Sequence, residues 1–219
     1  MLEQSLNNTA TTHQFISDKL CLIIYELSQI RYAVLELVMP QLEYKLKSND
    51  LKERREYTRL LSKMFSEKDS KLSKQLPQLW EAYLDRFGDA NEDIRRICVQ
   101  HICDFLVQQS ASIKSITGND QVQSSGSATS TSSSTSANNI NLLSSTSNQP
   151  PSTVQLDQII EQIKTRSLDS EESIRFEVVQ EILKAIKLEH DLISIDLLNI
   201  LRDRTLDVKI KVRKFALQG

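Results

Sequence analysis

The sequence predicts an all-α fold in which helices pair and stack along one direction. Apolar residues recur at the three- and four-residue spacing of amphipathic helices almost everywhere outside one segment. The 219 residues include only four glycines and four prolines, whereas a β-rich protein of this length would need more turn residues. A short motif that returns about every 40 residues indicates that the helices form repeats.

Nine stretches show the helical spacing of apolar residues. They span residues 20–30, 35–46, 57–65, 76–87, 94–105, 156–163, 174–186, 197–201 and 212–217. The apolar stripe of the first consists of Leu20, Ile23, Ile24, Leu27 and Ile30. Pro40 lies inside the second stretch, where it either delays the start of the helix or kinks it. Each remaining stretch is predicted to be one helix.

Residues 110–152 interrupt this pattern. They contain 15 serines and 5 threonines, and Lys114 and Asp120 are their only charged residues. This composition offers too little apolar surface to offset the entropy cost of ordering, so we expect one long disordered insertion. Doubling the length of a loop about three times adds only roughly 2 kcal/mol of loop-closure entropy, which a packed stack of helices tolerates. The serines permit phosphorylation, although an inert low-complexity loop is the simpler interpretation.

A motif of one aspartate, four residues, one aliphatic residue and one arginine marks the start of every second helix. Clear copies run from Asp89 to Arg95, from Asp169 to Arg175 and from Asp207 to Arg213, and a degenerate copy runs from Ser48 to Arg54. Successive arginines lie 41, 80 and 38 residues apart, and the insertion of roughly 40 residues accounts for the long gap. Two helices per period of about 40 residues are typical of HEAT or armadillo repeats. The sequence therefore predicts a HEAT-repeat α-solenoid, an α-α superhelix.

The residue types of the motif suggest a structural role. An aspartate before a helix accepts hydrogen bonds from unpaired N–H groups and complements the positive end of the helix dipole. An arginine in the first turn opposes that dipole and needs an anionic partner, for which the aspartate of a neighbouring repeat is the natural candidate. We therefore predict a structural Asp–Arg ladder, rather than a ligand site, formed by Asp89, Asp169, Asp207, Arg54, Arg95, Arg175 and Arg213.

These patterns divide the chain into four parts. We expect a disordered N-terminus at residues 1–14, HEAT-type repeats at 15–109, the insertion at 110–152 and further HEAT-type repeats at 153–219. Few residues follow the last copy of the motif, so the final helix is expected to be truncated, with an open apolar face. This favours a fragment of a longer solenoid or an incomplete gene model.

The sequence carries no motif for catalysis, cofactors or metals. A glycine-rich phosphate loop, GxSxG and HExxH are all absent, so we predict no enzymatic activity and no cofactor. Cys98, His101 and Cys103 spread around a helix and lack a fourth metal ligand. Together with Cys21, these cysteines are expected to be buried, reduced thiols of an intracellular protein. No apolar stretch is long enough to span a bilayer.

Several strings resemble a family of cohesin regulators called precocious dissociation of sisters, member five. They are PQLEYKLKSND at residues 40–50 with its continuation to residue 65, residues 79–80 with 83–87, residues 169–175, and residues 201–207 with 212–214. The resemblance covers about residues 16–109 and 153–217. The long Ser/Thr insertion departs from the family, which has a short loop there.

The resemblance implies a nuclear, chromatin-associated scaffold. Members of the family bind the kleisin subunit of the cohesin ring, work with a cohesin-releasing factor, and help to control sister-chromatid cohesion, chromosome segregation and DNA repair. The alternatives are another HEAT scaffold, such as a nuclear-transport receptor or a phosphatase scaffold subunit, and a solenoid that binds nucleic acid directly. The net charge of −2 argues against the last of these.

Two clusters of basic residues remain, from Lys45 to Lys74 and from Arg202 to Lys214. Within the second, Lys209, Lys211 and Lys214 are candidates for a patch that binds DNA, an acidic peptide or an inositol phosphate. An ordinary solvated helix surface is the alternative interpretation.

Overall fold

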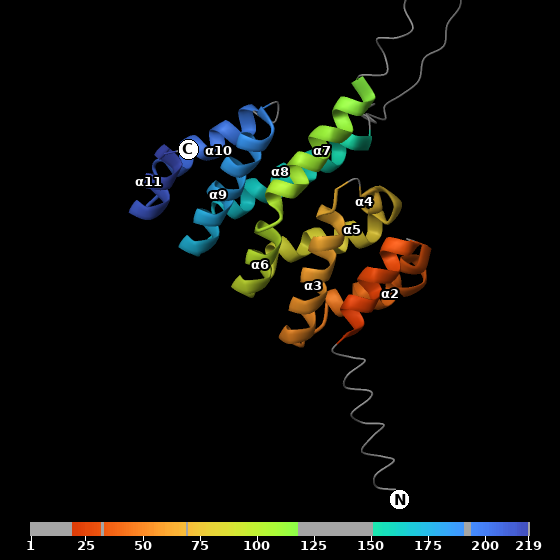
Figure 1. Ribbon diagram of the computed structural model, residues 1–219. Coiled ribbons are helices and arrows are strands. Elements are labelled where there is room, and N and C mark those ends of the chain that lie inside the picture. Colours follow the sequence, from red (N-terminus) through yellow and green to blue (C-terminus); the bar gives the residue numbers. More distant parts are fainter. Residues whose placement is uncertain (1–18, 32, 69, 118–150, 191–193, 219) are drawn as a thin grey trace, which may run out of the picture.

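The computed structural model describes residues 19–31, 33–68, 70–117, 151–190 and 194–218. Every regular element within these ranges is a helix, and the helices follow one another as a stack from the N-terminal to the C-terminal side (Figure 1). The predicted all-α fold is therefore confirmed. The predicted disordered N-terminus, residues 1–14, lies outside the described residues.

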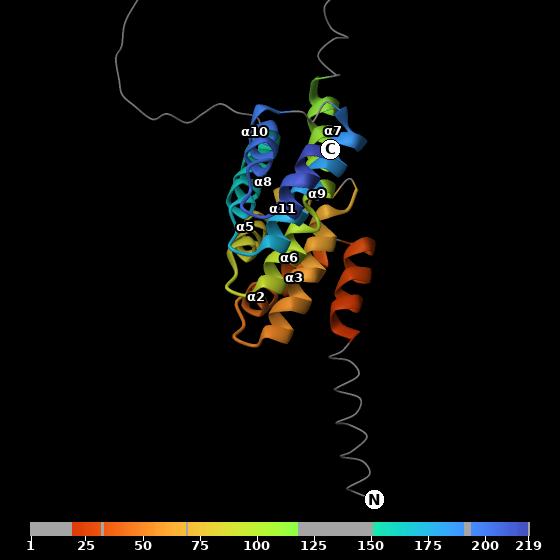
Figure 2. The ribbon, with the colours of Figure 1, turned by 90° about the vertical axis from the view of Figure 1, so that its left-hand side faces the viewer.

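Within the described residues, four helix pairs make up the stack. They are α2 (Ala33–Leu46) with α3 (Leu51–Ser66), α5 (Pro77–Leu84) with α6 (Glu92–Val99), α8 (Pro151–Ser167) with α9 (Glu172–Leu188), and α10 (Ile195–Arg204) with α11 (Ile210–Gln218). Figure 2 shows two layers, in which the first helices of the pairs form one layer and the second helices form the other. Because α3 packs on α6, α6 on α9 and α9 on α11, each pair buries its apolar faces against its neighbours.

At three of the predicted helices the structure settles an open point or shows a break. α2 begins at Ala33 and continues through Pro40, so the proline does not delay the start of the helix. The stretch at 76–87 splits into α5 and a 3-10 turn, η1 (Asp85–Gly88). The stretch at 94–105 breaks between α6 and α7 (Ile102–Thr117). A short helix, α4 (Leu72–Gln75), precedes α5.

The ends of the predicted insertion, residues 110–152, are helical. α7 runs to Thr117 and α8 begins at Pro151, so the helices extend into that segment from both sides. The two helices thus overlap the first and last residues of the predicted insertion. Residues 118–150, which hold the core of the predicted insertion, lie outside the described residues.

Residues 19–30 form a further helix, which lies beside α3 at the edge of the second layer (Figure 2). The hydroxyl of Tyr25 donates a hydrogen bond to Oε1 of Glu67 at 3.0 Å. The ammonium of Lys63 lies 3.6 Å from the centre of the Tyr25 ring, a cation–π contact. These polar and aromatic contacts attach the helix to the stack.

The apolar stripe expected on this first helix is not its buried face. Ile24 is buried, whereas the other four residues of the stripe, Leu20, Ile23, Leu27 and Ile30, are exposed. Cys21 and Tyr25 pack against the core instead, because α3 contacts the helix from their side. Helical spacing alone does not show which side of an apolar helix meets its neighbour.

A cluster of aromatic rings joins α3, α5, η1 and α7. Its members are Phe65, Trp80, Tyr83, Phe87 and Phe105. The indole N–H of Trp80 donates to the side-chain oxygen of Gln158 at 2.9 Å, which joins α5 to α8 across the insertion. The parts of the chain before and after the insertion therefore share one continuous core.

Candidate functional site

The three aspartates of the motif lie in the turns that join the helices of a pair. Each carboxylate accepts the backbone N–H of the residue two positions later, at 2.9 Å for Asp89, 3.0 Å for Asp169 and 2.9 Å for Asp207. Each aspartate therefore lies in the turn just before the second helix and accepts an N–H there, while a later residue occupies the cap position of the helix. At α6 the capping residue is Asn91, whose side chain accepts from the N–H of Asp93 at 3.0 Å.

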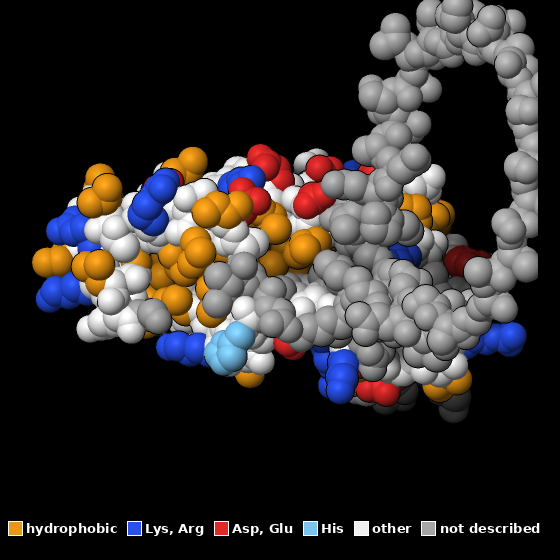
Figure 3. All heavy atoms as spheres, turned by 90° about the horizontal axis from the view of Figure 1, so that it is seen from above, with side chains coloured by type: hydrophobic (Ala, Val, Ile, Leu, Met, Phe, Trp, Pro, Cys, Tyr) orange, Lys and Arg blue, Asp and Glu red, His pale blue; other side chains and the backbone are white. Residues whose placement is uncertain are grey.

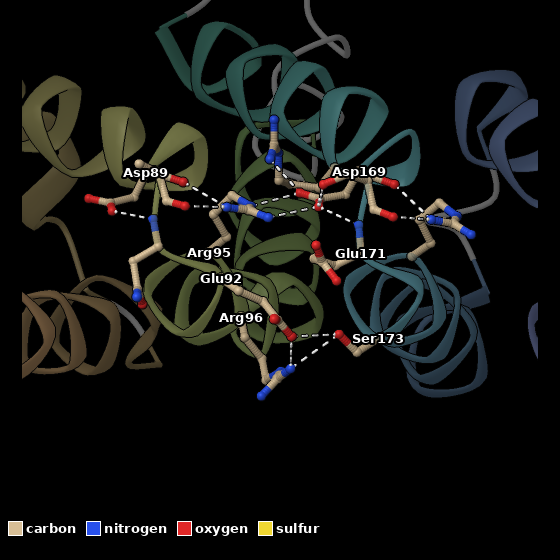
Figure 4. A network of polar contacts seen from close by, with 12 residues as sticks. Asp89, Glu92, Arg95, Arg96, Asp169, Glu171 and Ser173 are labelled. Carbon is tan, nitrogen blue, oxygen red and sulfur yellow. Dashed lines mark hydrogen bonds and ion pairs between the residues drawn. The ribbon is translucent and has the colours of Figure 1, made fainter.

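The arginines of the motif reach from one repeat to the aspartate of the next (Figure 4). Arg95 donates from Nε and Nη2 to the two carboxylate oxygens of Asp169, at 2.8 and 2.9 Å. Arg175 donates in the same way to Asp207, at 2.8 and 3.0 Å. The equivalent pair in the first junction, Arg54 with Asp89, has one close bond of 2.9 Å and one long contact of 3.4 Å. Bidentate geometry of this kind is the strongest that an arginine forms with a carboxylate.

The same arginines also hold the turn of their own repeat. Nη1 of Arg95 donates to the backbone carbonyls of Asp89 and Ala90, at 2.9 and 3.1 Å. Bonds to the carbonyl six residues earlier recur at the other motif arginines, with lengths of 2.6 Å for Arg54, 2.8 Å for Arg175 and 2.6 Å for Arg213. The six-residue spacing of the motif therefore brings the guanidinium back over its own turn. Arg213 ends the row, and no carboxylate pairs with it among the described residues.

The structure adds a second arginine to each aspartate, which the sequence reasoning missed. It lies three residues before the aspartate, and its Nη1 donates to Oδ2 at 2.9 Å for Arg86, 2.5 Å for Arg166 and 2.8 Å for Arg204. The sequence does contain a signal for this arginine, because the pattern Arg-x-x-Asp occurs at all three motif aspartates. At each junction two guanidinium groups therefore face one carboxylate.

Burial and pairing have opposite effects on the pKa values of the ladder aspartates. The hydrogen bond from Arg175 lowers the pKa of Asp207 to about 2, although burial alone would raise it. Burial raises the pKa of Asp169, but the bonds from Arg95 and from the N–H of Glu171 outweigh it, so the net shift is downward. Hydrogen bonds to these carboxylates raise the pKa of Arg95 and of Arg175. All of these groups thus stay charged at neutral pH, as a buried ion pair requires.

A second row of contacts runs along the first turns of the second-layer helices. Each contact joins two neighbouring repeats. On one side is the residue that directly follows a motif arginine, and on the other is the residue that lies two positions before the motif arginine of the next repeat. The three contacts use different chemistry: Arg55 forms an ion pair with Asp93, Arg96 donates to the hydroxyl of Ser173 at 3.1 Å, and Lys211 lies 4.5 Å from the ring centre of Phe176. The repeats are therefore joined by two parallel rows, of which only the first has uniform chemistry.

The three lysines of the predicted polyanion patch all lie exposed at or just before α11. Lys209 is 3.9 Å from a carboxylate oxygen of Glu172, and Lys211 covers the ring of Phe176. The structure gives Lys214 no such contact among the described residues. The patch is thus partly engaged in contacts with α9.

Other candidate sites have ordinary surroundings. Cys98 and Cys103 are buried and Cys21 is half-buried, and burial raises the pKa of all three thiols. The part of the chain that the structure describes contains no group of three or more metal-binding side chains placed to hold an ion. None of its helices combines the length and the apolar character needed to cross a membrane.

Comparison with known sequences identifies relatives for most of the chain. The family model described as "Sister chromatid cohesion protein PDS5 protein" matches residues 2–127 and 128–219. The chain is 35% identical over 197 residues to Sister chromatid cohesion protein PDS5 homolog B-B of Xenopus laevis. The aligned stretch covers 90% of this chain and 10% of that protein. Homolog B of Homo sapiens is 35% identical and homolog A of Danio rerio 33% identical over the same length. The chain spans about a tenth of the length of these relatives.

Among solved structures, the chain is similar to one in the structure of the Pds5–Scc1 complex. The TM-score is 0.65 at 12% sequence identity, and the similarity covers 93% of this chain and 24% of that chain. This likeness confirms the predicted HEAT-repeat solenoid, and the family match confirms the resemblance seen in the sequence strings. The chain belongs to the sister chromatid cohesion protein PDS5 family.

Proposed function

We propose that this chain is part of a scaffold that regulates sister chromatid cohesion in the nucleus and that performs no catalysis itself. The family's role in cohesion supports this function. The observation that carries the proposal is the Asp–Arg ladder, because its buried bidentate bonds hold successive helix pairs in one register. A stack held in this way offers a continuous surface for a long partner segment rather than a reaction pocket.

The proposed partners are the kleisin subunit of the cohesin ring and a cohesin-releasing factor. The similar solved chain was determined in a complex with Scc1, which supports the kleisin as the first of these. Association with chromatin is then indirect, through cohesin. The family match favours this function over that of a nuclear-transport receptor or a phosphatase scaffold subunit. The near-neutral net charge favours it over direct nucleic-acid binding.

The test is affinity purification of the tagged full-length protein from dividing cells, followed by quantitative mass spectrometry. We expect the kleisin and the other cohesin subunits to be enriched over a tag-only control. Enrichment of transport factors or phosphatase subunits, with cohesin at the control level, would contradict the proposal.

A further inference from the structure

Ser173 of the third repeat occupies the position that Asp93 has in the second repeat. Each lies two residues before the motif arginine of its repeat, and each is the second residue of its helix, α9 or α6. Asp93 forms an ion pair with Arg55 of the preceding repeat. Ser173 faces the equivalent arginine, Arg96, which donates from Nη2 to its hydroxyl at 3.1 Å. The junction between the second and third repeats therefore places a serine opposite an arginine, where the preceding junction has a carboxylate.

The side chains around Ser173 leave its hydroxyl accessible. Ser173 is exposed and lies apart from the buried ladder (Figure 4). Its hydroxyl also donates to Oε1 of Glu92 at 2.8 Å. The guanidinium of Arg96 is shared among carboxylates: it forms an ion pair with Glu92 and lies 3.6 Å from Asp93 and 3.8 Å from Glu177. The side chains of Arg96 and Glu92 are 34% and 39% exposed, so both can change partners without disturbing the core.

The two other serines of this segment have different surroundings. The hydroxyl of Ser170 lies 3.5 Å from Oδ1 of Asp169, so a phosphate on Ser170 would meet a carboxylate. Ser167 is buried, and its hydroxyl donates to the backbone carbonyl of Lys164 at 2.7 Å. Within residues 167–175, all of which the structure describes, Ser173 is thus the serine that combines exposure with a guanidinium contact.

We propose that Ser173 is a phosphorylation site and that its phosphate pairs with Arg96. A protein kinase transfers the γ-phosphoryl group of ATP: the bond from Oγ to phosphorus forms, the bond from phosphorus to the oxygen of ADP breaks, and the hydroxyl proton passes to a base. The phosphate carries about −1.5 to −2 charges and three acceptor oxygens, so Arg96 exchanges Glu92 for it and Glu92 turns to solvent. Negative charge at the second residue of α9 also suits the positive end of the helix dipole.

Phosphorylation then changes how firmly the second and third repeats are joined. The unmodified junction has the buried pair of Arg95 with Asp169, and the phosphate adds a second charged contact at the surface. Two separate contacts restrict the tilt of one repeat on the other more than one does. Glu177 stays near Arg96 and opposes the phosphate. The gain is therefore that of a partly exposed ion pair, a factor of about two to five in the ratio of folded to unfolded protein.

The first test measures the pairing directly. Phosphoserine is incorporated at residue 173 during synthesis of the chain, and phosphorus NMR follows its titration. The second pKa of a phosphoserine is about 6, and a nearby guanidinium lowers it because it stabilises the dianion. We expect Arg96→Met to raise the pKa of this phosphate, and Arg59→Met, at an exposed position of α3, to leave it unchanged. An equal pKa of the phosphate with and without Arg96 would overturn the pairing.

The second test is a double-mutant cycle followed by urea unfolding. We expect phosphoserine at residue 173 to raise the ratio of folded to unfolded protein about two- to fivefold when Arg96 is present and not in Arg96→Met. Ser173→Asp, which introduces the residue type of Asp93, should give part of this gain, whereas Ser173→Asn should give none. Phosphoserine at residue 170 is the matched control, and its effect should not depend on Arg96. The same effect of phosphoserine 173 in both backgrounds would contradict the proposal.

The third test establishes whether cells use the site. Trypsin cleaves after Arg166 and Arg175, so it releases residues 167–175 as one peptide. Fragment-ion mass spectrometry of the full-length protein, purified from dividing and from resting cells, locates phosphate within this peptide. We expect phosphate on Ser173, and its loss in Ser173→Ala. A peptide without phosphate in both cell populations, or with phosphate only on Ser170, would overturn the assignment.

Discussion

Arg95 joins two repeats with one guanidinium group. Its Nε and Nη2 donate to the carboxylate of Asp169 at 2.8 and 2.9 Å, while its Nη1 donates to two carbonyls of its own turn. The two side chains are buried and lie 74 residues apart in the sequence. The position of the third repeat on the second is therefore specified by a directional contact in addition to apolar packing.

Removal of this arginine should be costly. Arg95→Ala leaves the buried carboxylate of Asp169 with Arg166 as its remaining cation, and we expect a loss of about 3 kcal/mol in the free energy of unfolding. Arg95→Lys should recover only part of it, because an ammonium cannot form the bidentate pair. Urea unfolding followed by circular dichroism measures the change. The control is Arg202→Ala, whose pair with Asp203 is exposed, so a loss of similar size there would contradict the argument.

The second arginine of a junction should contribute less than the first. Arg166→Met keeps both bonds between Arg95 and Asp169 and removes a buried N–H that lacks a partner. We expect a cost of about 1 kcal/mol or less for Arg166→Met in a wild-type background. In an Arg95→Ala background the same change should cost clearly more, because Asp169 then loses its last cation. Additive effects in this double-mutant cycle would show that the two arginines act independently.

The ladder should make the stability of the folded chain depend on pH in the acidic range. The pKa of Asp207 is lowered from 3.8 to about 2 in the folded chain, so the contribution of this carboxylate is fully present above about pH 4. It is lost as the pH falls through about 2, where the folded state also becomes protonated. Thermal unfolding between pH 2 and 5 measures the effect. We expect Asp207→Asn to be less stable than the wild type at neutral pH and to show a smaller decrease on acidification. Parallel pH profiles for the two proteins would contradict this assignment.

The bond between Trp80 and Gln158 should help to hold the two sides of the insertion together. Gln158→Leu removes the acceptor and leaves the indole N–H of a buried tryptophan unpaired. We expect a cost of about 1–3 kcal/mol by urea unfolding. Gln100→Leu is the matched control, because its hydrogen bond to Glu177 is exposed and its loss should have little effect.

The lysines at α11 provide a test of polyanion binding. If they bind DNA or an inositol phosphate, the triple variant Lys209→Glu, Lys211→Glu, Lys214→Glu should weaken that binding strongly at low salt. Fluorescence anisotropy with labelled duplex DNA, with inositol hexakisphosphate as competitor, measures both affinities. Unchanged affinities would leave these residues as ordinary helix surface that contacts Glu172 and Phe176.

Several features of the fold follow from the sequence because their causes are local. Apolar spacing and the scarcity of glycine and proline predict helices, and the Asp-to-Arg spacing predicts where second helices begin. The break between α6 and α7 has no equally clear local signal, since residues 94–105 continue the apolar spacing across it. The exposed stripe of Leu20, Ile23, Leu27 and Ile30 is a similar case, because only the position of α3 decides which side of that helix is buried.

The period of the stack and the residues that mark each turn can be read from the sequence alone. Tertiary structure decided that Arg95 binds the aspartate of the following repeat, and that Arg166 adds a second cation to the same carboxylate. It also decided that Gly88 and Leu168, from two different repeats, line the same open groove. The physical reason is distance along the chain: these partners come together only when separate helix pairs stack, and stacking depends on the shapes of both faces at once.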